Sequence, residues 1–136
     1  MSKEVVEAYI EAINSHNVNR LIQLMDSEYC FIDTWNNSED KETMKTGWAE
    51  YFKLFPDYHI EVRDLLYDKD IFTVFGYASG TYKNTNNHWH LPAAWKVIAN
   101  DHKILHWQVY CNAKVPLDCM NKEDQNAFIY NEKNND

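Results

Sequence analysis

The chain has 136 residues, of which 45% are hydrophobic and 15% aromatic, and its formal net charge at pH 7 is −8. This length suits one globular domain with a single core, and the acidic balance, with no cluster of Lys and Arg, argues against binding to nucleic acids or anionic membrane surfaces. No stretch approaches the ~20 consecutive apolar residues of a membrane-spanning helix.

Three helices are predicted in the first half of the chain. Apolar residues recur at spacings of three and four between Glu4 and Asn14, and Tyr9 lies on the same face. Asn17 is expected to cap a short second helix, and Thr46 a third that ends at Pro56. The aromatic stripe of this third helix consists of Trp48, Tyr51, Phe52 and Phe55.

Alternating apolar patterns predict five strands. The first is EYCFIDTW at residues 28–35, followed by a polar loop at residues 36–45. After Pro56 four further runs, joined by short polar turns, predict an antiparallel meander, and Gly76 and Gly80 predict bulges or bends that curl it. These runs are YHIEVRDLLY, IFTVFGYASGTY, HWHLPAAWKVI and ILHWQVYCN. Helices followed by a curved, mainly antiparallel sheet predict an α+β cone with the amino-terminal helices on the concave face.

One domain is expected over residues 1–113, and residues 114–136 are expected to form a partly flexible appendage. A weak apolar patch, Ala127-Phe-Ile-Tyr130, lies near its end. The amino terminus MSKEVVEAYI lacks the basic start and apolar run of a signal peptide, so we expect a cytoplasmic protein.

Three segments resemble the NTF2-like superfamily, and within it the SnoaL-like and ketosteroid-isomerase-like proteins. They are VVEAYIEAINSHNVNRLIQLMDSEYCFID, the Gly47 helix ending in FPDYHIEV, and DHKILHWQVY. The resemblance extends from Glu4 to about Ala113 and implies an NTF2-like cone around a ligand pocket. It also implies a homodimer through the convex sheet face, where we expect His106, Gln108 and Tyr110.

The resemblance assigns candidate catalytic residues in the first third of the chain. Asp33 falls where ketosteroid isomerases have their proton-shuttling carboxylate, Tyr9 where they have the tyrosine of the oxyanion hole, and Asn14 fits the end of the same helix. Ala93 or Ala94 replaces their second acid. In SnoaL-like cyclases a catalytic acid stands where this chain has Cys111, and a histidine where it has Trp95.

The residues themselves leave two interpretations of Asp33 and Tyr9. A carboxylate among aromatic side chains loses hydration and becomes a better base, and a tyrosine hydroxyl can stabilise developing negative charge. Alternatively, Asp33 caps the loop after the first strand, and Tyr9 is a core tyrosine whose hydroxyl has found a partner.

Aromatic side chains are expected to wall the pocket, although the same residues could fill it. The predicted ligand-binding residues are Asn14, Trp35, Trp48, Phe52, Phe55, Trp95, Trp107 and Cys111. Cys111 has no basic neighbour of the same strand parity, because His106 is five residues away, and the packing role of a free thiol is favoured for it.

Neither a metal nor another cofactor is expected. His88 and His90 form an HxH pair to which His59 or His106 could add a third ligand, but no acid or cysteine at short spacing completes the set. The other cysteines, Cys30 and Cys119, are far apart and lack a CxxC pair, which favours free thiols.

The expected function is binding of a small apolar or aromatic molecule, with acid/base isomerase or lyase chemistry by Asp33 and Tyr9 as its catalytic form. The alternative is a non-catalytic binding or protein-interaction module of the same fold. The sequence leaves both open.

Overall fold

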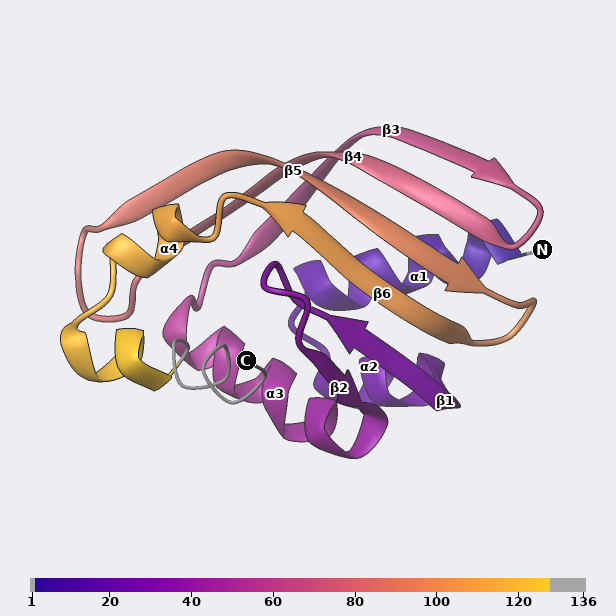
Figure 1. Ribbon diagram of the computed structural model, residues 1–136, viewed down its shortest axis with the longest axis horizontal. Helices are drawn as coiled ribbons and strands as arrows, with labels where there is room; N and C mark the ends of the chain where they lie inside the picture. Colours follow the sequence, from indigo (N-terminus) through magenta and orange to yellow (C-terminus); the bar gives the residue numbers. More distant parts are fainter. Residues whose placement is uncertain (1, 128–136) are drawn as a thin grey trace.

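The computed structural model describes residues 2–127, which form a six-stranded sheet with helices on one side of it (Figure 1). In chain order the elements are α1 (Ser2–Asn14), α2 (Val18–Leu24), β1 (Met25–Ile32), β2 (Ser38–Asp40), α3 (Lys41–Leu54), β3 (His59–Asp68), β4 (Ile71–Thr81), β5 (His88–Ala99), β6 (Ile104–Cys111) and α4 (Lys114–Asp118).

The strand order is β2-β1-β6-β5-β4-β3. Only the pair of β1 and β6 is parallel among these neighbours, and β3 to β6 form the predicted meander. The sheet therefore confirms the predicted α+β class with a curved, mainly antiparallel sheet.

Curvature of the sheet has a local cause near Gly76. The pairing of β3 with β4 shifts register between Val62 and Asp64, and Gly76 is the partner of Val62 at this bulge. Gly80, by contrast, pairs regularly with Trp89, so there is no bulge at this position of the β4–β5 pair.

The main core lies between α1 and the concave face of the sheet. Val6, Tyr9 and Ile13 on α1 are fully buried, as are Val74 of β4 and Val97 of β5. This matches the predicted apolar face of the first helix. Within residues 2–127, none of the helices is long and apolar enough to cross a membrane.

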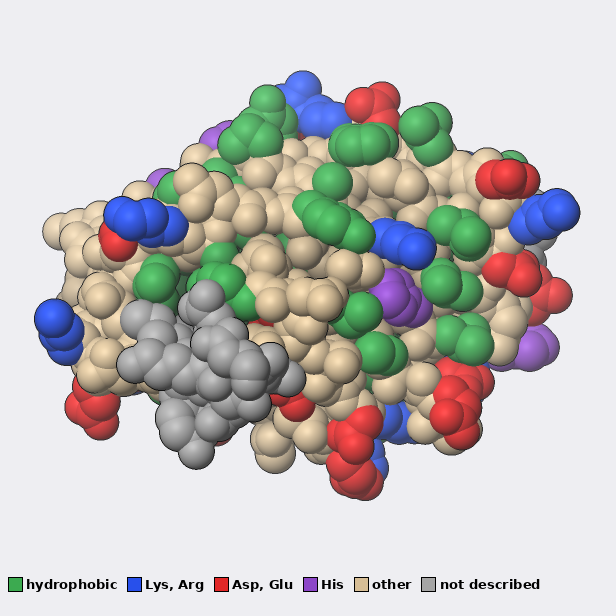
Figure 2. Space-filling model, in the orientation of Figure 1, with side chains coloured by type: hydrophobic (Ala, Val, Ile, Leu, Met, Phe, Trp, Pro, Cys, Tyr) green, Lys and Arg blue, Asp and Glu red, His purple; other side chains and the backbone are tan. Residues whose placement is uncertain are grey.

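Large apolar side chains are exposed on the convex face of the sheet. Phe75 pairs with Ala94 and Ala94 with Tyr110, so these residues of three strands share one face. Figure 2 shows hydrophobic side chains over β3 to β6, with basic and histidine side chains between them. The exposed apolar residues of this face include Leu66, Ile71, Phe75 and Tyr110.

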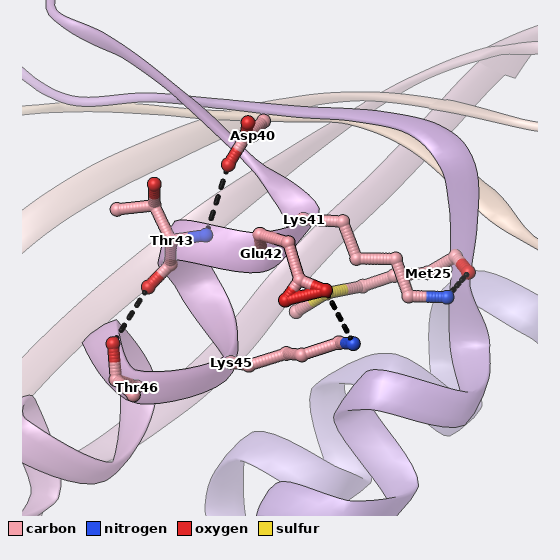
Figure 3. A network of polar contacts seen from close by, with 7 residues as sticks. All are labelled: Met25, Asp40, Lys41, Glu42, Thr43, Lys45 and Thr46. Carbon is pink, nitrogen blue, oxygen red and sulfur yellow. Dashed lines mark hydrogen bonds and ion pairs between the residues drawn. The ribbon is translucent and has the colours of Figure 1, made fainter.

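The start of α3 differs from the sequence prediction. Asp40 caps the helix by accepting a hydrogen bond from the Thr43 amide at 2.9 Å, and the Lys41 ammonium donates to the Met25 carbonyl (Figure 3). Thr46 instead lies inside the helix, where its hydroxyl donates to the Thr43 carbonyl. The predicted Thr46 cap is therefore wrong, and the loop predicted at residues 36–45 is wrong from Ser38 on, where β2 and α3 lie.

The segment after β6 packs against the end of the meander that carries the β4–β5 turn. The Tyr82 hydroxyl donates to Asp124, and the Asn87 amide donates to the Cys119 carbonyl at 3.1 Å. The remainder of the predicted appendage, residues 128–136, and with it most of the Ala127–Tyr130 patch, lies outside the described residues.

Candidate functional site

A cavity of about 560 Å³ lies between α3, the concave side of the sheet and the segment after β6. Its walls are mainly apolar, and all five tryptophans of the chain contribute to them. These tryptophans are Trp35, Trp48, Trp89, Trp95 and Trp107.

Helical and strand periodicity explain how the walls arise. Met44, Trp48 and Tyr51 follow one another at spacings of four and three along α3, so they face the same side. Alternate residues of β6, including Trp107 and Cys111, point to the concave face. A further part of the wall comes from the appendage, through Pro116, Leu117, Met120, Asp124 and Ala127.

Most of the predicted site residues line this cavity, namely Asp33, Trp35, Trp48, Phe55, Trp95, Trp107 and Cys111. Trp95 and Trp107 are each 1% exposed and form walls of a cavity that stays open. Three predicted site residues, Tyr9, Asn14 and Phe52, are not among the lining residues found in the described part of the chain.

Asp33 lies at the cavity but also holds the loop after β1. One carboxylate oxygen accepts hydrogen bonds from the Trp35 and Asn37 amides, both at 2.9 Å. The other accepts from the Asn37 side-chain amide at 3.0 Å. The half-buried Asp33 therefore combines features of both interpretations, a place in the cavity wall and an Asx-type cap of the loop.

Tyr9 is fully buried in the core. Its hydroxyl lies 2.6 Å from the Tyr29 hydroxyl and accepts a hydrogen bond from the Trp48 indole at 3.1 Å. Burial raises the pKa of Tyr9 well above its ordinary value. The hydroxyl thus already has the protein partners expected of a core tyrosine.

Asn14 and Phe52 both make contacts within the fold. The Asn14 side-chain amide exchanges two hydrogen bonds with the Ile60 backbone, at 2.8 and 2.9 Å. The Phe52 ring stacks on His16 with centroids 4.1 Å apart.

The polar groups of the cavity include several that the sequence analysis did not assign. Tyr51 and Tyr58 both line the walls, as does Trp89. Strand parity offered a signal for two of them, because Tyr58 alternates with buried Ile60, and Trp89 shares its parity with Trp95.

Electrostatics distinguish the rim from the interior. At the rim, burial and the nearby charges of Asp33 and Asp40 raise the pKa of Glu39. In the interior, burial raises the pKa of the Cys111 thiol to about 11, so this thiol is protonated at neutral pH and is not activated as a nucleophile.

The two histidines of the HxH pair, His88 and His90, contact protein side chains. His88 Nδ1 lies 2.8 Å from the Thr81 hydroxyl, and the His90 ring stacks on Tyr77. Across residues 2–127 there is no group of three or more His, Cys, Asp or Glu side chains placed to hold a metal ion.

Comparison with known families identifies the fold family. The model of the SnoaL-like domain matches residues 6–107, which is more than half of the chain. The chain belongs to the SnoaL-like domain family. A search of curated protein sequences finds no significant match to this SnoaL-like chain.

Solved structures agree with this family. A hypothetical protein of ketosteroid isomerase-like fold from Catenulispora acidiphila, in complex with trimethylamine, is 18% identical, with a TM-score of 0.76 over 87% of this chain and 92% of that one. IdmH from Streptomyces antibioticus, a candidate polyketide cyclase, is 16% identical, with a TM-score of 0.74 over 86% and 96%. A candidate SnoaL-like polyketide cyclase from Shewanella denitrificans is 9% identical, with a TM-score of 0.74 over 85% and 93%. At these identities the likeness shows the NTF2-like and ketosteroid isomerase-like fold.

In this SnoaL-like chain, strands β5 and β6 contribute no acid to the cavity. Ala93 pairs with Cys111 across β5 and β6, and its side chain is buried, whereas Ala94 lies on the opposite face with Tyr110. The acids that line the cavity within residues 2–127 are Asp33, Glu39, Glu50 and Asp124. All four belong to other segments than β5 and β6.

Proposed function

We propose that this SnoaL-like chain binds a small, largely apolar or aromatic molecule in the cavity. The observation that carries the proposal is an opening of about 560 Å³ walled by all five tryptophans. Ligand pockets typically have volumes of ~300–1,000 Å³ and mainly apolar walls with few polar groups. The names of related structures fit this proposal, since candidate polyketide cyclases act on organic molecules.

Acid/base catalysis by Asp33 with Tyr9 stays a prediction within this proposal. Asp33 supports it by lining the cavity. The hydroxyl of Tyr9, however, is bound to Tyr29 and Trp48, and β5 and β6 supply no acid to the cavity. Non-catalytic ligand binding needs none of these groups and is the form of the function that the cavity supports best.

Binding can be tested with N-phenyl-1-naphthylamine, a neutral aromatic probe that brightens in apolar surroundings and absorbs light emitted by tryptophan. We expect 1:1 binding, with quenched tryptophan emission and enhanced probe emission. Replacing Ala78, a buried lining residue, by leucine places a larger side chain in the cavity and should weaken binding about tenfold.

Ala94→Leu is the matched control, because Ala94 lies on the other face of the sheet. Its affinity for the probe should stay within about twofold of the wild type. A wild-type chain that does not bind the probe, or equal weakening by both substitutions, would contradict binding in this cavity. Circular dichroism verifies that both variants are folded.

We further propose that the chain forms a homodimer through its convex sheet face. The support is the exposed apolar set on this face, in which Leu66 is 59%, Tyr110 53% and Phe75 44% exposed. A second copy would cover the same patch on both subunits, as two-fold symmetry requires.

Sedimentation equilibrium tests the homodimer. Wild type should sediment as a dimer, and Phe75→Glu should raise the dissociation constant at least about tenfold, because it places like charges in the centre of the interface. Val115→Glu makes the same change at an exposed apolar residue of α4 and should leave the dimer intact. A monomeric wild type refutes the proposal.

A further inference from the structure

Two tyrosines of the cavity have hydroxyl groups that find no hydrogen-bond partner among the described residues. Tyr51 comes from α3 and Tyr58 from the turn before β3, and their rings pack edge to face with centroids 5.0 Å apart. We call them the tyrosine pair. Tyr58 is only 7% exposed and Tyr51 is half-buried, and among residues 2–127 neither hydroxyl makes a hydrogen bond.

The hydroxyl groups of Tyr51 and Tyr58 have no hydrogen-bond partner within residues 2–127, but they are not closed to solvent. In the described part of the chain, the polar side-chain atoms that are both closed to solvent and unpaired are Asn37 Oδ1 and Trp89 Nε1. The hydroxyls of the tyrosine pair therefore keep access to open space, and both residues line the cavity.

Other buried tyrosines of this chain behave differently. The hydroxyls of Tyr9 and Tyr29 bind each other, and that of Tyr82 donates to Asp124. Buried tyrosine hydroxyls ordinarily find a partner. Because the tyrosine pair has none from residues 2–127, a bound molecule is the natural source of one.

The tyrosine pair offers donors in a low-polarity setting. Tyr51, Tyr58 and Cys111 all line the cavity, and burial raises the pKa of each of them. All three groups are protonated at neutral pH. Two O–H donors can be directed at the two lone pairs of one oxygen.

Charges at the rim disfavour an anionic ligand. The two lining lysines already face acids, Lys53 at 3.4 Å from Glu50 and Lys83 at 3.9 Å from Asp124. Asp33 and Glu39 have no ion pair with a basic side chain within residues 2–127. The oxygen that the tyrosine pair accepts is therefore expected to be neutral.

We propose that the tyrosine pair is the hydrogen-bonding end of the cavity and binds one neutral acceptor oxygen, such as a ketone or quinone carbonyl, on an otherwise apolar ring system. This inference rests on the proposed function and specifies its ligand class. It assigns recognition to Tyr51 and Tyr58, both remote in sequence from Asp33 and Tyr9.

Two probes that differ by one oxygen test the proposal, namely 9-fluorenone and fluorene, measured by equilibrium dialysis. Tyr51→Phe and Tyr58→Phe should each weaken binding of 9-fluorenone about fivefold, because each removes one hydrogen bond. The affinity for fluorene should stay within about twofold. Tyr110→Phe, on the exposed convex face, should change neither affinity.

The outcomes separate this inference from the proposed function. If both probes bind but the Phe variants do not discriminate between them, the tyrosine pair is not the polar end and the cavity proposal survives. If neither probe binds the wild type, both proposals fail. Tighter binding of anionic fluorene-9-carboxylate than of 9-fluorenone overturns the neutral acceptor, and selective loss of 9-fluorenone in Tyr9→Phe alone assigns the contact to Tyr9.

Discussion

Replacing Gly76 by alanine is expected to lower the free energy of unfolding by about 3 kcal/mol or more, a cost at the upper end of overpacking. A Cβ atom at Gly76 would lie 1.8 Å from the Glu61 carbonyl oxygen and 2.9 Å from its carbon. Both are backbone atoms at the bulge of β3, so they cannot turn aside as a side chain can. Relief requires moving β3 away from β4.

The same substitution at Gly47 is the matched control, with the opposite sign. There the added Cβ meets the Met44 side chain, with Sδ at 3.0 Å, which can rotate away. Gly47 lies inside α3, so alanine should stabilise the fold by about 0.5–1 kcal/mol through helix propensity. Urea denaturation followed by circular dichroism measures both values. Equal stability of the two variants would refute the backbone collision.

Helices and strands were predictable where periodicity is strong, and less so where local and tertiary contacts decide. Pro56 predicted the end of α3 to within two residues, since the helix ends at Leu54 with Phe55 as its C-cap. Its start was missed because Asp40, a better cap than the mid-helix Thr46, accepts from Thr43. The bond from Lys41 to the Met25 carbonyl, a contact across 16 residues, leaves no signal in local sequence.

The candidate site was predictable in composition but not in its polar contacts. Trp95 and Trp107 were expected either to wall the pocket or to fill it, and both line the open cavity on the concave side of the sheet. The partner of the Tyr9 hydroxyl was not predictable, since Tyr29 and Trp48 reach it from other elements. Whether a tyrosine contacts a ligand or the core depends on such tertiary contacts, which periodicity does not encode.

The second large effect on stability is expected at Asn14, whose side chain is hydrogen-bonded to the backbone of β3. β3 is an edge strand of the sheet. One side of it pairs with β4, and the opposite side faces no neighbouring strand within residues 2–127. The Asn14 amide donates to the Ile60 carbonyl at 2.9 Å and its oxygen accepts from the Ile60 amide at 2.8 Å, so the side chain replaces a neighbouring strand. Ile60 is only 2% exposed, and water has little access to these groups.

Asn14→Ala should therefore lower the free energy of unfolding by about 2–3 kcal/mol, because it leaves a buried donor and a buried acceptor unpaired. Asn86→Ala, at an exposed position of the β4–β5 turn, should change it by less than about 0.5 kcal/mol. Urea denaturation gives both values, and titration with N-phenyl-1-naphthylamine at low urea gives the affinity of the folded fraction. We expect that affinity to be unchanged. Unaltered stability with weakened probe binding would instead return Asn14 to the ligand-binding role predicted for it from the sequence.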